Sequence, residues 1–95
     1  MDAMRLESGR QAIRQLVLKV LALHARQFQP VELIWDSDTS GQVQWLHLYV
    51  QSKAETHRTI PFSHSQLESA VRPHDPESYR TLQDYIERNL QPLID

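Results

Sequence analysis

Residues 43–50 constrain the fold of this chain more than any other segment. They read Val-Gln-Trp-Leu-His-Leu-Tyr-Val, are flanked by turn-forming residues, and are too few for a well-formed helix, so they predict a β-strand. Successive side chains of a strand point to opposite faces. One set here is aliphatic, whereas the other consists of the ring side chains Trp45, His47 and Tyr49. Because neither set is plainly suited to water, the pattern predicts the central strand of a sheet.

Two further strands are predicted on either side of this segment, at residues 31–35 and 56–62, joined through turns at 36–41 and 52–55. A slip of one residue would send every side chain to the other face, so the register that separates aliphatic from ring side chains is favoured. That register gives an inner face of Leu33, Leu46, Leu48, Val50, Ile60 and Phe62. The outer face is then Ile34, Trp45, His47, Tyr49, His57 and Thr59, with Glu32 at its margin.

Three helices are predicted around these strands. A capping box at Ser8 and Gln11 starts the first, over residues 9–27, which leaves residues 1–7 frayed. A short helix follows residue 63, and Asp75-Pro76 starts the last one, which Pro92 ends. We therefore expect a single domain over residues 1–95, of the α+β class. Its order is α-β-β-β-α-α, with a three-stranded antiparallel sheet and two long helices packed on one face.

The first helix is apolar around most of its circumference. Besides its main face it carries a second apolar strip on the other side, formed by Leu18, Leu21, Ala22 and Ala25. This strip is either part of a wide core face or a contact with a second subunit. The second interpretation predicts a homodimer.

Several functional classes lack their usual residues. The absence of cysteine excludes disulfides, thiolate zinc sites and cysteine nucleophiles, and two glycines are too few for a phosphate-binding loop. We expect a non-catalytic protein without a cofactor. The longest apolar run, residues 16–23, is interrupted by Lys19 and is shorter than the roughly 20 residues of a membrane span. With no signal-peptide pattern, the expected location is the cytoplasm, with no membrane partner.

Nucleic-acid binding has limited support. The net charge is −2, with the basic side chains concentrated before residue 30. Arg10 and Arg14 lie one helical turn apart and could contact phosphates, which makes a nucleic-acid-associated regulator one alternative function. Lys19 and Arg26 fall on nearly the opposite side of the helix, so no phosphate-tracking stripe forms and a nucleic-acid partner is not favoured.

A divalent-metal or small-ligand site is the other alternative. Asp36, Asp38 and Ser40 alternate before Gly41, as in the first half of a calcium-binding loop. The twelfth position of that pattern is His47 instead of the required glutamate, and the same residues are common in plain hairpin turns. The histidines show no spacing that would hold a metal ion.

The outer sheet face carries the favoured functional hypothesis. Tryptophan and tyrosine combine a large apolar area with a polar tip and are enriched where proteins meet. We expect a small interaction domain, of adaptor or inhibitor type, that binds a protein partner through this face. Ile34, Trp45 and Tyr49 would be its apolar anchors, and His47, His57 and Glu32 would supply polar selectivity. The competing interpretation is that helices of the same chain cover these rings, or that Trp45 is simply part of the core.

Overall fold

The computed structural model describes residues 3–24, 29–51, 57–72 and 74–94. Its elements are, in order, α1 (Ala3–His24), β1 (Gln29–Ser37), β2 (Val43–Gln51), β3 (His57–Ser63), α2 (His64–Ala70) and α3 (Pro76–Ile94). The predicted α+β class and element order are confirmed. In the described part of the chain, no helix combines the length and apolar composition required to cross a membrane.

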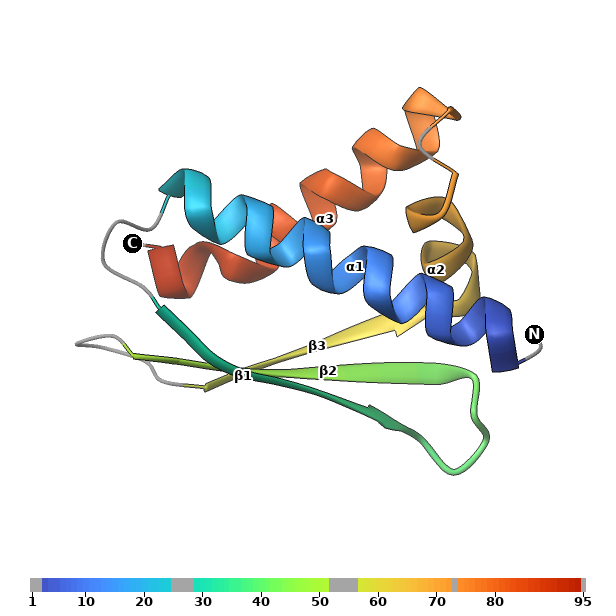
Figure 1. The fold of residues 1–95 in the computed structure, drawn as a ribbon, viewed down its shortest axis with the longest axis horizontal. Helices are drawn as coiled ribbons and strands as arrows, with labels where there is room; N and C mark the ends of the chain where they lie inside the picture. The colour runs from blue at the N-terminus through green and yellow to red at the C-terminus, as the bar shows by residue number, and fades with distance from the viewer. Residues whose placement is uncertain (1–2, 25–28, 52–56, 73, 95) are drawn as a thin grey trace.

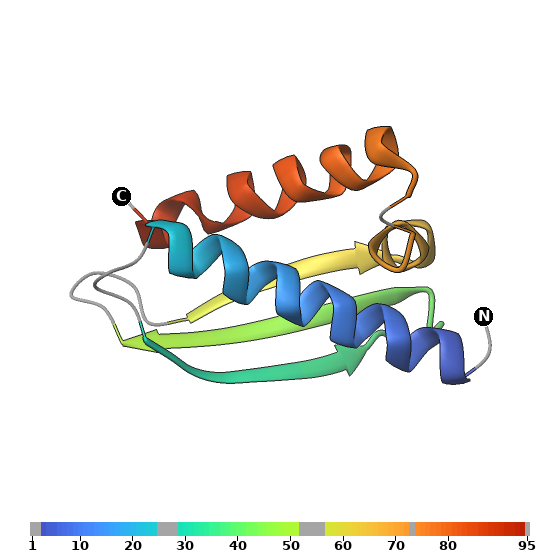
Figure 2. The same cartoon turned by 45° about the horizontal axis from the view of Figure 1, so that its top comes forward.

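The molecule has two layers, a sheet and a layer of helices. The sheet is antiparallel with strand order β1-β2-β3, so β2 is central as predicted. Figures 1 and 2 show α1, α2 and α3 all on the same side of the sheet, with α1 and α3 running across it. Among the described residues, none of the helices lies on the opposite side of the sheet.

The register separates two kinds of side chain, as predicted. Leu46 of β2 lies between Trp35 and Ile60, and Leu48 lies between Leu33 and Arg58. A bulge between Pro30 and Glu32 shifts the pairing at the start of β1. Because the segregated register places the aliphatic side chains under the helices, burial of apolar area stabilises it over a register slipped by one residue.

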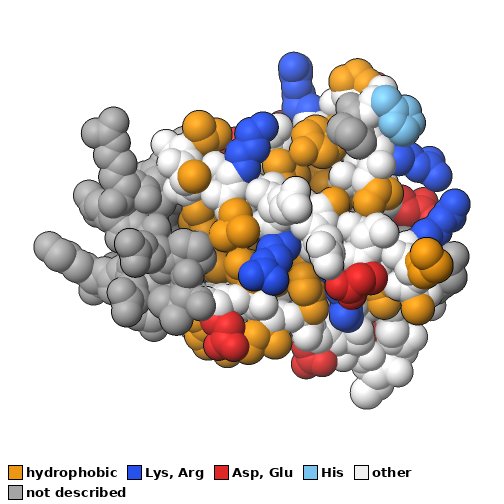
Figure 3. Space-filling model, viewed as in Figure 1, with side chains coloured by type: hydrophobic (Ala, Val, Ile, Leu, Met, Phe, Trp, Pro, Cys, Tyr) orange, Lys and Arg blue, Asp and Glu red, His pale blue; other side chains and the backbone are white. Residues whose placement is uncertain are grey.

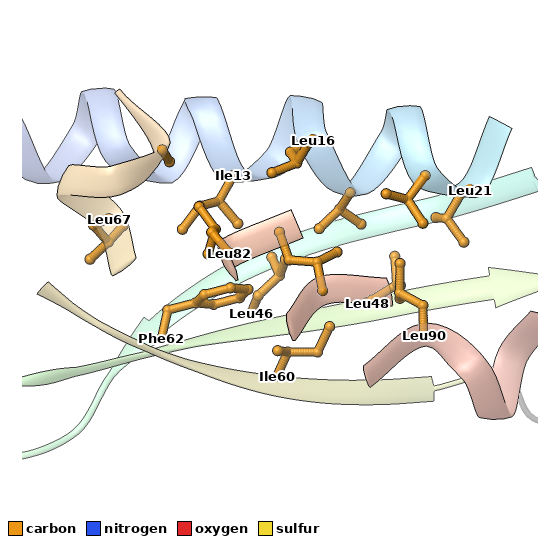
Figure 4. Packing of buried hydrophobic residues seen from close by; sticks show 14 residues of the cluster. Ile13, Leu16, Leu21, Leu46, Leu48, Ile60, Phe62, Leu67, Leu82 and Leu90 are labelled. Atoms are coloured by element: carbon orange, nitrogen blue, oxygen red, sulfur yellow. The ribbon is translucent and has the colours of Figure 1, made fainter. Parts of the chain in front are cut away.

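The core lies between the sheet and the helices (Figure 4). Its fully buried members from the strands are Leu46, Leu48, Ile60 and Phe62. The helices contribute Ile13, Leu16, Val17, Val20, Leu21, Leu67, Ala70, Leu82, Ile86 and Leu90. The Phe62 ring also contacts two aromatic rings at its margins, with Trp35 tilted against it at 5.7 Å between centroids and Tyr85 edge-on at the same distance.

Two of the predicted helix starts are confirmed. Ser63 caps α2, because its hydroxyl accepts the Gln66 N–H at 3.2 Å while the Gln66 side chain accepts the Ser63 N–H at 2.8 Å. At α3 the Asp75 carboxylate accepts the Ser78 hydroxyl at 3.1 Å. Such caps satisfy donors that a helix start would otherwise leave without partners.

The predicted start of α1 is wrong. The helix begins at Ala3, so Ser8 and residues 3–7 lie inside it. Gln11 donates to Glu7 at 3.3 Å, a contact between side chains one turn apart, and Leu6 packs against the core. The prediction that Pro92 ends the last helix is also wrong, because α3 continues to Ile94. The helix tolerates Pro92 because this residue lies two positions before the helix end, where its missing N–H removes only one hydrogen bond of the last turn.

Candidate protein-interaction face

The side of the sheet opposite the helices carries three rows that run across all three strands, and we call these nine side chains the open face. The rows are Asp36-Trp45-Pro61, Ile34-His47-Thr59 and Glu32-Tyr49-His57, each read from β1 through β2 to β3. They share one face because alternate residues of paired antiparallel strands point the same way. All six residues predicted to bind a partner belong to the open face.

The predicted apolar anchors are accessible in different degrees. Ile34 is 41% exposed and Tyr49 is 38% exposed, whereas Trp45 is half-buried among its neighbours. Glu32 and His57 are exposed. Helices α1, α2 and α3, which are the helices in the described part of the chain, all lie on the other side of the sheet and do not cover these rings (Figures 1 and 2).

Three rings form a ladder across β2 and β3. The Tyr49 and His57 rings stack at 4.6 Å between centroids, and the His57 and His47 rings lie 5.8 Å apart, each pair 18° from parallel. The Thr59 hydroxyl lies 3.1 Å from His47 Nδ1 and 3.3 Å from His57 Nε2. Because a hydroxyl donates one hydrogen bond, at least one imidazole must donate to it. Thr59 thus holds both imidazoles in fixed orientations.

Charge is distributed unevenly over the open face. Glu32 and Asp36 both come from β1, and both are exposed. The three rows take His57, Thr59 and Pro61 from β3, and none of the nine side chains is lysine or arginine. One edge of the face is therefore acidic, and the other carries hydrogen-bonding groups and no negative charge.

The predicted subunit-contact strip on the first helix does not form one surface. Leu21 is 1% exposed and belongs to the core, on the side of α1 that faces the sheet (Figure 4), so its assignment to a second strip is wrong. Leu18 is half-buried and Ala22 is exposed, while Ala25 lies outside the described residues. Leu21 is buried because the sheet and α3 together cover a wide face of α1. In Figure 3, the hydrophobic side chains on this side of the molecule are interspersed with lysine and arginine.

The two arginines of the nucleic-acid alternative have different environments. Arg10 is half-buried, and its guanidinium donates to Gln44 Oε1 and Ser37 Oγ, each at 3.1 Å, and lies 5.7 Å from the Trp35 ring centroid. Arg14 is exposed. The pair therefore does not offer two free guanidiniums to a phosphate backbone. Sequence reasoning missed the buried Gln44, although its position in β2 has the same parity as the inward-facing Leu46.

The loop of the metal alternative is closed by its own hydrogen bonds. Asp38 accepts the Ser40 hydroxyl at 2.9 Å and the Val43 N–H at 3.3 Å, while Gly41 adopts a φ of 74°. The Ser40 hydrogen bond is the main reason that the pKa of Asp38 is lowered. Asp36 instead accepts the N–H of Ser37 at 2.8 Å. Among the described residues, no three His, Asp or Glu side chains form a group able to hold a metal ion.

A hollow of about 400 Å³ lies between α2 and α3, away from the open face. Its lining includes Ser65, Ser69 and Ser78, beside Glu77 and Arg88, but no histidine. A serine nucleophile needs an adjacent base, usually histidine. The lining of this hollow therefore lacks the serine–histidine pair of a hydrolase.

The open face is the surface where side chains from all three strands gather without a covering helix. It combines exposed apolar groups, fixed rings and an acidic edge. Comparisons of this chain with protein-family models, with curated proteins and with solved structures find no match.

Proposed function

We propose that this chain is a small non-catalytic interaction domain, of adaptor or inhibitor type, that binds a protein partner through the open face. The observation that carries the proposal is the one-sided packing of the helices. It leaves Ile34 and Tyr49 substantially exposed on a regular sheet. Sheets normally bury an apolar face against another layer, and exposed apolar patches on small domains mark interaction sites.

The arrangement of the open face suits protein recognition. Apolar and aromatic groups occupy its middle, and charged or hydrogen-bonding groups stand at both edges, as in many protein interfaces. Tyr49 and the two imidazoles are already held by stacking and by Thr59. Side chains that are ordered before binding lose little conformational entropy when a partner docks.

Two substitutions at equally exposed sites, one on the open face and one outside it, test this proposal. Ile34 on the open face and Val71 at the end of α2 are both 41% exposed. We expect Ile34→Glu to abolish capture of partner proteins from a cell extract and Val71→Glu to leave capture unchanged. Circular dichroism would verify that both variants fold. Capture that survives both Ile34→Glu and Tyr49→Glu would contradict the proposal.

A further inference from the structure

We propose that the partner on the open face is a second copy of this chain, with the two sheets packed face to face about a two-fold axis parallel to the strands. This inference rests on the proposed function, because it requires the open face to be a binding surface. The assembly would have four layers, helix-sheet-sheet-helix. Each copy would cover the face that the other leaves without helices.

The hydrogen-bonding and charged groups at the two edges of the open face select this axis. A two-fold rotation about the strand direction turns the second sheet over and places its β3 above β1 of the first, with rows in the same order. Glu32 then faces His57 of the second copy, and the same contact recurs by symmetry. When the Thr59 hydroxyl donates to His57 Nε2, the proton of the neutral imidazole lies on Nδ1, from which it can be donated to the carboxylate.

The acidic side chains of β1 disfavour the other axis that would bring the two sheets face to face. A two-fold axis perpendicular to the strands places β1 above β1 of the second copy and reverses the order of the rows. Glu32 would then face Asp36 of the second copy, which brings like charges together. Repulsion between facing charges suppresses such an arrangement.

The middle column of the open face lies along the favoured axis. Trp45, His47 and Tyr49 would each meet the equivalent side chain of the second copy, and Ile34 would meet Thr59 of that copy. Offset aromatic pairs contribute to binding beyond the area they bury. A chain of this size has a modest core, so association adds useful apolar burial. The patch is smaller than the roughly 20–30 residues a side of a standard interface, so we expect a weak dimer, with a dissociation constant on the order of micromolar or above.

A charge exchange tests the geometry. Glu32→Lys would set a lysine against His57, and His57→Glu would set a glutamate against Glu32, so each variant alone should self-associate about tenfold more weakly than wild type. An equimolar mixture of the two variants should recover wild-type association as a heterodimer, because both facing pairs then become attractive. The controls are Asp84→Lys and His74→Glu, which make the same changes at exposed sites outside the open face. Sedimentation velocity over a concentration series and native mass spectrometry would measure the result.

Two results would overturn the inference. One is a wild-type chain that stays monomeric at concentrations up to about 1 mM, far above the dissociation constants of weak complexes. The other is a mixture of Glu32→Lys and His57→Glu that associates no better than either variant alone. If the wild type is monomeric but Ile34→Glu still abolishes capture of another protein, only the second-copy inference fails. If no capture depends on Ile34 or Tyr49 either, the proposed function fails with it.

Discussion

Arg10 of α1 and Gln44 of β2 are joined by hydrogen bonds from the guanidinium Nε and Nη2 atoms to the amide oxygen of Gln44. Gln44 is only 1% exposed, and the same oxygen accepts the Ser37 hydroxyl at 2.9 Å. Its amide nitrogen donates to the Gly41 carbonyl at 3.2 Å. A buried amide is costly unless its hydrogen bonds are made. This contact therefore ties the first helix to the end of the sheet next to the 38–42 loop.

Removing Arg10 should destabilise the fold. Arg10→Ala takes away hydrogen bonds to Gln44 and Ser37 and the contact with Trp35, and we expect it to lower the free energy of unfolding by about 1–3 kcal/mol. Urea denaturation would measure the change. Arg14→Ala, at an exposed site one turn later, is the control and should cost less than about 0.5 kcal/mol. Equal effects of the two substitutions would contradict this account of Arg10.

Gly9 should not tolerate alanine, although alanine is normally the better helix former by about 1 kcal/mol. A Cβ atom at Gly9 would lie 2.8 Å from Leu67 Cβ and 3.1 Å from the Leu67 carbonyl oxygen, so α1 and α2 would have to separate. We expect Gly9→Ala to destabilise the protein by about 1–3 kcal/mol in thermal or urea unfolding. Ser8→Ala, at the exposed neighbouring position, should be neutral or slightly stabilising. A stabilised Gly9→Ala variant would show that the two helices are not in close contact.

Protonation of the Asp38 carboxyl at low pH should destabilise the hairpin loop. Its pKa lies below the ordinary 3.8, chiefly because the Ser40 hydroxyl donates to the carboxylate. A lowered folded-state pKa means that the stabilising contribution is present above pH 3.8 and is lost as the pH falls through the folded pKa. Ser40→Ala should raise the pKa of Asp38, as measured by an NMR titration of the carboxyl. An unchanged titration would remove Ser40 as the cause.

Ionisation of Tyr85 at high pH should lower the stability of the fold. Burial raises the pKa of its phenol above 10.0, and the hydroxyl donates to the Pro61 carbonyl. A raised folded-state pKa means that this contribution is present below pH 10.0 and is lost as the pH rises through the folded pKa. Tyr85→Phe should cost about 1 kcal/mol at neutral pH and remove this alkaline loss. Urea unfolding of wild type and variant at pH 7 and above pH 10 would compare them.

The strand register could be predicted because the information is local. Side chains of alternating type in residues 43–50 leave one register that puts Leu46 and Leu48 on the buried side, and a slip would expose both. The starts of α2 and α3 were predictable for a similar reason, since Ser63 and Asp75 bond to residues three positions away. Local periodicity and local hydrogen bonds require no knowledge of distant contacts.

Several features that were misassigned or missed from the sequence depend on contacts between distant segments. Leu21 is buried because both the sheet and α3 pack against α1, and helical periodicity alone does not reveal how wide a face neighbouring elements cover. Gly9 is required where α2 approaches α1, a contact with a residue 58 positions along the chain. Arg10 bonds to a residue 34 positions away. Such contacts arise only when the elements pack.

The sequence by itself determined the order of the elements, the central strand and which side chains share each sheet face, because these follow from periodicity and turn chemistry. Only the tertiary structure decided that none of the described helices covers the outer sheet face, and hence that Ile34 and Tyr49 remain exposed. It also decided that the guanidinium of Arg10 is bound within the chain. The physical reason is that helix placement depends on the summed burial of apolar area over the whole chain, which no short stretch of sequence contains.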